Sequence, residues 1–185
     1  MPKYFQISDG RIWSTDEARF VSSAPDGTEV VALCRAEGPA DEACLRRSLE
    51  SLGYKIGYEL MASREEAAAA KLQEINAACD AALAALTAMY PERELLSFER
   101  QEREARALIS GDTSNTAHIA AIASGRGIPV EDLAQKIVAK ADAFSVASGT
   151  LIGQRQKWED MLKAAQTKEN VIAIQPVYSL PEAQS

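Results

Sequence analysis

Two stretches of the chain repeat small and apolar residues at alternating spacings of three and four. This spacing places the repeated residues on one side of a helix, and it is typical of long helices that pack in pairs. The first stretch, here named the first seam, consists of Ala68, Leu72, Ile75, Cys79, Ala82, Leu86 and Met89. The second seam consists of Val130, Ala134, Ile137, Ala141, Phe144, Ser148, Leu151, Arg155, Trp158, Leu162 and Ala165.

The two seams differ in side-chain size. The first alternates small residues with Leu, Ile and Met, whereas the second carries the large side chains of Phe144 and Trp158. Because small residues facing large ones pack closely, we expect the two long helices to form an antiparallel hairpin, connected by two shorter helices. Pairing of each seam with its own copy in a dimer is the alternative. Arg155 in the second seam favours some exposure there, or pairing with an acidic residue.

Local signals place the ends of the long helices. Ser63 and Glu66 have the spacing of a capping box, in which the hydroxyl accepts from the Glu66 N–H and the carboxylate reaches back. The first long helix ends just before Pro91. Pro129 begins the last long helix, which extends to about Ala165.

Two glycines lie inside the last long helix, and shorter elements surround it. Gly149 and Gly153 each cost roughly 1 kcal/mol relative to Ala inside a helix. They indicate a bend, a close helix contact or a break into two helices. The shorter predicted elements are helices at 97–110 and 116–124, and a last segment at 170–174 that is either a helical turn capped by Thr167 or, over 171–174, a strand.

Residues 1–61 mix strand and helix signals and predict a small α+β module. The expected elements are a hairpin of residues 4–7 and 11–13, a turn at 25–27, a buried strand at 29–34, a helix at 41–52 with Leu45, Leu49 and Leu52 on one face, and a strand at 55–61. The predicted fold class is therefore α+β. The module at 1–61 precedes a helical hairpin domain at 62–175 and a flexible tail at 176–185.

Composition and charge indicate which classes of binding partner to expect. The chain has 185 residues, of which 46% are hydrophobic, and a net charge of -7. An acidic surface repels phosphate backbones and anionic lipids, so we expect no nucleic-acid and no membrane partner. No apolar run reaches the length of a membrane span, and the first ten residues lack the apolar core of a signal peptide. We therefore expect a cytoplasmic protein.

Candidate catalytic residues are few. His118 is the single histidine, and the three cysteines, Cys34, Cys44 and Cys79, lie in no recognisable catalytic motif or zinc-ligand spacing. The carboxylates between Glu92 and Glu104 alternate with arginines and indicate a solvated charged helix face. We predict no catalytic, metal-binding or cofactor-binding residue and no enzymatic activity. A small enzyme using Cys34 or His118 is the alternative.

Four segments follow one another between residues 71 and 167. They are KLQEINAACDAALAAL, YPERELLSFERQEREARAL, IASGRGIPVEDLAQKIVAKADAF and SGTLIGQRQKWEDML. This series resembles proteins encoded in phage and prophage tail modules, including tail-fibre-assembly-like proteins. The resemblance implies a non-enzymatic tail-associated protein, either an assembly chaperone for a tail fibre or a minor tail component, that binds a tail-fibre or baseplate polypeptide. It also implies a location in the cytoplasm of a bacterial host or in association with the virion. A general helical interaction or homo-oligomerisation module unrelated to phage is the alternative.

Overall fold

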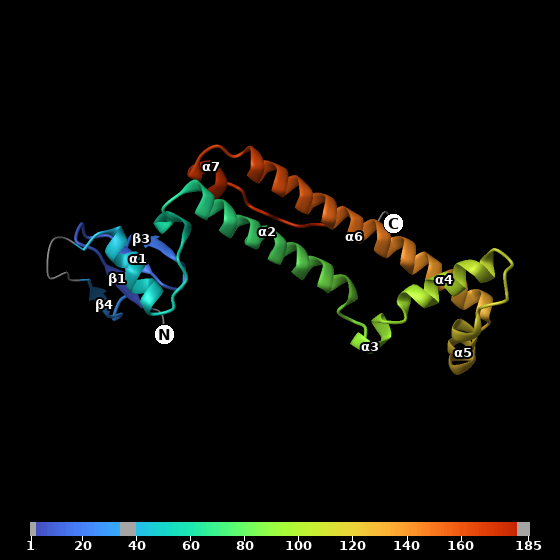
Figure 1. Cartoon of the computed structure of the whole chain (residues 1–185). Helices are drawn as coiled ribbons and strands as arrows, with labels where there is room; N and C mark the ends of the chain where they lie inside the picture. Colours follow the sequence, from blue (N-terminus) through green and yellow to red (C-terminus); the bar gives the residue numbers. More distant parts are fainter. Residues whose placement is uncertain (1–2, 34–39, 181–185) are drawn as a thin grey trace. The chain divides into compact units, whose positions relative to one another are not determined.

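The computed structural model describes residues 3–33 and 40–180 of the chain (Figure 1). A small four-stranded sheet near the N-terminus precedes a mainly helical region, which contains one helix of 35 residues. The predicted α+β class is confirmed. The chain divides into two compact units, of which the first comprises residues 1–71 and 164–174 and the second comprises residues 72–163 and 175–185. Each unit is described by itself.

The sheet of the first unit has short strands. They are β1 (Tyr4–Gln6), β2 (Ile12–Ser14), β3 (Arg19–Val21) and β4 (Val30–Ala32), in the order β3-β2-β1-β4. β1 pairs antiparallel with β2, as the predicted hairpin requires, and β2 pairs antiparallel with β3. β4 joins the other side of β1 in parallel. The predicted turn at 25–27 is present, because the Thr28 N–H donates to the Pro25 carbonyl at 3.1 Å.

The core of this unit lies between the sheet and helix α1 (Glu42–Ser51). Trp13 is fully buried there with Phe5, Leu45 and Leu49. Asp41 caps α1 by accepting a hydrogen bond from the Cys44 N–H at 2.8 Å, which places Leu45 and Leu49 on the buried face.

Three sequence predictions for the first unit are wrong. Residues 55–61 form no strand and instead contain the 3-10 helix η1 (Tyr58–Leu60). Leu52 is exposed, because it follows the last turn of α1. The strand predicted as buried at 29–34 is β4, an edge strand with Val31 38% exposed. Cys34, at the end of that prediction, lies outside the described residues.

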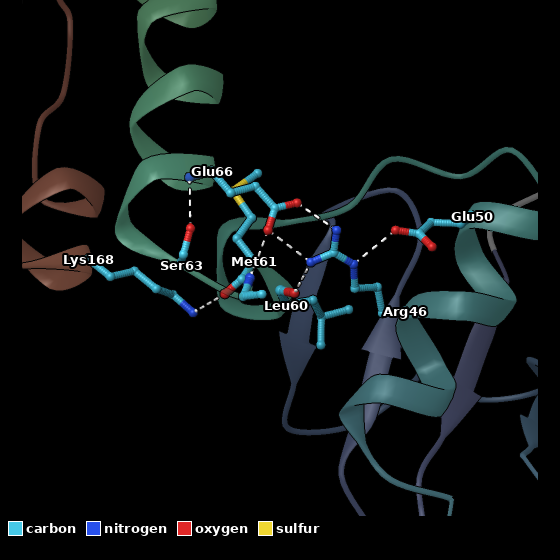
Figure 2. A network of polar contacts seen from close by, with 8 residues as sticks. Arg46, Glu50, Leu60, Met61, Ser63, Glu66 and Lys168 are labelled. Carbon is cyan, nitrogen blue, oxygen red and sulfur yellow. Dashed lines mark hydrogen bonds and ion pairs between the residues drawn. The ribbon is translucent and has the colours of Figure 1, made fainter.

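A polar network in the first unit surrounds the start of helix α2 (Arg64–Thr87), shown in Figure 2. The Ser63 hydroxyl accepts from the Glu66 N–H at 3.1 Å, which confirms that half of the predicted capping box. The Glu66 carboxylate reaches back one residue further, to the Ala62 N–H at 2.8 Å. It also pairs with Arg46 at 2.6 Å, and this contact, followed by the Ala62 hydrogen bond, lowers the pKa of the Glu66 carboxyl. The α1 helix is thereby tied to the first turn of α2.

The remaining helices are α3 (Glu92–Leu95), α4 (Phe98–Ile109), α5 (Ala117–Arg126), α6 (Val130–Ala164) and α7 (Lys168–Ile172). The four-residue α3 was not predicted. The others follow the sequence prediction closely. Thr167 caps α7 through the Asn170 N–H at 3.2 Å, so the helical alternative for this segment is confirmed. α2 ends earlier than predicted, at Thr87, which leaves Met89 outside the helix and 95% exposed.

α6 is one unbroken helix. It continues through Gly149 and Gly153, so a break into two helices is excluded. A Cβ atom added at either glycine would meet no atom within 4 Å, so neither position is a close helix contact.

In the second unit, α2 and α6 run antiparallel, as predicted for a hairpin. The Arg155 guanidinium donates to the Asn76 side chain at 3.4 Å, and the Cys79 thiol lies 3.9 Å from the Leu151 carbonyl oxygen. Asn76 contacts Arg155, whereas Cys79, later in α2, contacts Leu151, which is earlier in α6. The two helices therefore run in opposite directions. Arg155 also pairs with Glu159 at 3.1 Å, which is the acidic partner expected for it.

The segment after α7 also contacts both helices of the hairpin. The Tyr178 hydroxyl donates to the Ile75 carbonyl at 2.9 Å, and Ser179 and Gln154 exchange two hydrogen bonds. These residues belong to the predicted flexible tail, of which residues 181–185 lie outside the described residues.

Candidate functional site

A groove of about 1010 Å³ lies in the second unit, where the last turn of α2 meets α3, α4, α5 and α6. Its apolar lining includes Leu86, Phe98, Ile122, Ile137 and Phe144. Phe144 is 46% exposed, although it belongs to the second seam. The groove is therefore an apolar surface that this chain leaves partly uncovered.

The unequal lengths of the paired helices create this groove. Counting on from the Cys79–Leu151 contact, the last residue of α2, Thr87, comes opposite Ala143. The part of α6 before that point has no further α2 turn to cover it. Tyr90 extends the contact slightly, since Lys140 donates to its hydroxyl at 3.2 Å.

α4 and α5 cover the first turns of α6 instead. Leu133 and Ala134 of α6 are buried with Ala105 of α4 and with Ile119 and Ala123 of α5. The groove lies between this cluster and the end of α2. At this point α4 and α5 no longer cover α6, and α2 does not yet cover it.

Charged residues of the groove are separated by sign. The acidic side chains come from α3 and α4, and they are Glu94, Glu99 and Glu102. The basic side chains come from α5 and α6, and they are Arg126, Lys136 and Lys140. We call these two sets the acidic rim and the basic rim. Glu102 pairs with Arg106 at 2.9 Å, whereas Glu99 and Lys136 are exposed and form no ion pair with any described residue.

His118 lines the same groove, on the first turn of α5. Its Nε2 atom is buried and has no hydrogen-bond partner among the described residues. A buried ring nitrogen without a partner is unfavourable to the folded state.

Glu104 holds the start of α5 against α4. Its carboxylate accepts from the backbone N–H groups of His118 at 2.8 Å and Ile119 at 3.2 Å, and from the Arg100 guanidinium at 2.7 Å. Glu104 is only 4% exposed. The prediction of a solvated charged face is wrong at this position, because the carboxylate is turned inward to cap a neighbouring helix.

The environment of Glu104 acts on its pKa in two directions. Burial raises the pKa of the carboxyl, whereas the hydrogen bonds from Arg100 and from the two α5 N–H groups lower it. The hydrogen bonds prevail, and the pKa lies below its usual value of 4.5. Glu104 is therefore ionised at neutral pH and stabilises the helix that carries His118.

The sequence-derived candidates for catalysis are not brought together. Cys79 is buried, and this burial raises the pKa of its thiol, which makes it a poor nucleophile at neutral pH. Cys44 is a half-buried free thiol of α1, and Cys34 lies outside the described residues. Within the described ranges, no three side chains of His, Cys, Asp or Glu are grouped as metal ligands would be. Every helix that the structure describes is too short or too polar to cross a bilayer.

Two comparisons with known proteins give a match. A family model described as the HI1402 helical domain matches residues 139–177, which include most of α6 and all of α7. An uncharacterised protein of Haemophilus influenzae is 41% identical over 54 residues, which are 29% of this chain and 79% of that protein. The chain belongs to the family of this H. influenzae protein. No solved structure matches the chain significantly.

The residues matched to the HI1402 helical domain include Phe144 and Lys140 of the groove. Glu99 and His118 lie outside them. Only part of the α6 side of the groove therefore falls within the matched region, since Lys136 and Ile137 precede it.

Sequence reasoning missed the groove, although the sequence contains one signal for it. The second seam begins at Val130 and is longer than the first, which ends at Met89. In an antiparallel hairpin the excess of the longer seam cannot be covered by its partner. That mismatch predicts an uncovered apolar stretch in the first half of α6.

Proposed function

We propose that this protein is a non-enzymatic, tail-associated protein of a phage or prophage, which binds a partner polypeptide through the groove. The partner would be a tail-fibre or baseplate polypeptide, and the protein would serve as an assembly chaperone or as a minor tail component. Its place of action would be the bacterial cytoplasm, with the virion as a second location.

The partly uncovered Phe144 in the groove is the observation that carries this proposal. A fully buried Phe side chain contributes about 1.5–3 kcal/mol relative to an exposed one, and Phe144 retains 46% of its exposure. A partner that covers it recovers part of that free energy. The resemblance of residues 71–167 to phage tail modules supports the choice of partner.

Affinity capture tests the proposal. The tagged protein would be recovered from a bacterial host after induction of the prophage, and the bound proteins identified by mass spectrometry. We expect a tail-fibre or baseplate polypeptide with the wild-type protein and its loss with Phe144→Glu. Val146→Glu is the matched control, because Val146 is also exposed on α6, at 66%, and does not line the groove. Recovery of no tail polypeptide by the wild-type protein would contradict the proposal.

A second candidate is a helical oligomerisation module. It is favoured by the additional exposed apolar side chains of α6, which include Val146, Ile152 and Met161. Sedimentation of the purified protein distinguishes the two functions. A stable oligomer that the Phe144→Glu and Val146→Glu variants both weaken, without capture of any tail polypeptide, would favour this second candidate.

A further inference from the structure

We infer that the groove binds one amphipathic α-helix of the partner, with basic residues along one edge of its apolar face and acidic residues along the other. This inference rests on the proposed protein-binding function, and it specifies the chemistry of the bound segment. Two features of the groove support it.

The apolar part of the groove is made by side chains from several helices. Leu86 comes from α2, Phe98 from α4, Ile122 from α5, and Ile137 and Phe144 from α6. Ile137 and Phe144 are seven residues apart, so they lie on one face of α6 and are separated by about two helical turns. A helix in a groove presents anchors with this same repeat, at i, i+3 or i+4, and i+7.

The charges of the two rims indicate which charged residues the bound helix carries. All acidic lining residues come from α3 and α4, and all basic ones come from α5 and α6. Glu99 on one rim and Lys136 on the other are exposed and free of ion pairs with described residues. A bound helix with Lys or Arg along the edge facing Glu99, and Asp or Glu along the edge facing Lys136, forms ion pairs with both residues. A helix with a single sign of charge on both edges would be repelled at one rim.

Selection from a displayed library of helical peptides tests the inference with the whole protein. The library would keep a helix-forming scaffold and randomise the positions of one face and of its two edges. We expect enrichment on the wild-type protein of peptides with an apolar i, i+3 or i+4, i+7 face and opposite charges on the two edges. The same peptides should be lost on Phe144→Glu and retained on Val146→Glu. Circular dichroism of both variants would confirm that each is folded.

Charge exchange gives a second readout that folding alone cannot explain. Glu99→Lys should weaken a selected peptide by about tenfold, and a peptide whose facing basic residue is changed to Glu should recover that loss on the variant. The interaction should weaken with added salt, because the rims are exposed.

Each outcome bears on the inference. Selected peptides without separated edge charges, binding that survives Phe144→Glu, or no enrichment at all would overturn it. A dimer of the protein that Phe144→Glu dissociates and Val146→Glu does not would assign the groove to a second copy of the chain and also overturn it. If capture yields a tail polypeptide while the selection fails, the proposed function stands without this inference. If the selection succeeds and capture yields no tail polypeptide, only the phage assignment falls.

Discussion

Among single residues, Glu104 shows that the charge pattern of a helix does not determine which of its charged side chains are buried. The alternation of acidic and basic residues in α4 is typical of a solvated helix face, and it describes Glu99 and Glu102 correctly. Glu104 belongs to the same alternation, yet it is buried and caps α5. Glu104 is buried because it packs against α5, and the sequence pattern of α4 contains no information about α5. A carboxylate that caps a different helix has no signature in its own segment.

Glu104→Gln should lower the free energy of unfolding of the protein by about 1–3 kcal/mol, since a charged acceptor of three hydrogen bonds is lost. Urea denaturation followed by circular dichroism measures this change. Glu102→Gln is the control on the same helix. It removes only the exposed pair with Arg106 and should cost about 0.5 kcal/mol or less. Equal effects of the two substitutions would contradict the capping role.

The contribution of Glu104 should also depend on pH. Because its folded-state pKa lies below 4.5, ionisation stabilises the folded state above that pH. The stabilisation is lost as the pH falls below 4.5 and through the folded-state pKa. The difference in stability between the wild-type protein and Glu104→Gln should therefore be full at pH 7 and shrink at more acidic pH. A difference that grows on acidification would contradict this account.

Gly57 is a second residue whose role depends on contacts distant in the sequence. A Cβ atom at this position would lie 1.7 Å from the Ala18 carbonyl oxygen and 2.8 Å from the Trp13 ring. Gly57→Ala should therefore destabilise the first unit by about 3 kcal/mol or more, because backbone must move to relieve the contact. Tryptophan fluorescence during urea denaturation would report on the buried Trp13. Unchanged stability would mean that the chain does not approach Gly57 as described.

Among the elements, the long helices were predicted closely, whereas the sheet was predicted only in part. Long helices have a 3.6-residue period that repeats many times, and proline and glycine mark their ends, so α4, α5 and α6 match the prediction to within two residues. Strands of three residues contain too few positions to show a period. β3 was therefore missed, η1 was predicted as a strand, and β4 was predicted as buried although it lies at an edge.

The two glycines of α6 should lower the stability of this helix. Gly149 and Gly153 have open space where a Cβ would lie, and α6 continues through both. Replacing both with Ala should stabilise the helix by about 1 kcal/mol per site, because Ala has the higher helix propensity. Thermal unfolding followed by circular dichroism would detect this as a higher midpoint. A lower midpoint would indicate that the glycines permit a close contact or a bend.

At the scale of the whole molecule, the groove follows from the mismatch between a 24-residue and a 35-residue helix in one hairpin. The seams predict the pairing of these helices, and the pairing of Cys79 with Leu151 sets its register. How α4 and α5 share the cover of α6 depends on side-chain packing among four helices. Neither the groove nor the separation of its charges by sign could therefore be obtained from the sequence pattern of any one segment.

Site-specific photo-crosslinking in cells shows whether a tail polypeptide occupies this groove. A photoreactive phenylalanine analogue would replace Phe144 in one variant and Val146 in another, and both would be irradiated after prophage induction. We expect a covalent adduct with a tail-fibre or baseplate polypeptide from position 144 and none from position 146. Adducts of equal yield from both positions, or no tail polypeptide from position 144, would contradict this expectation.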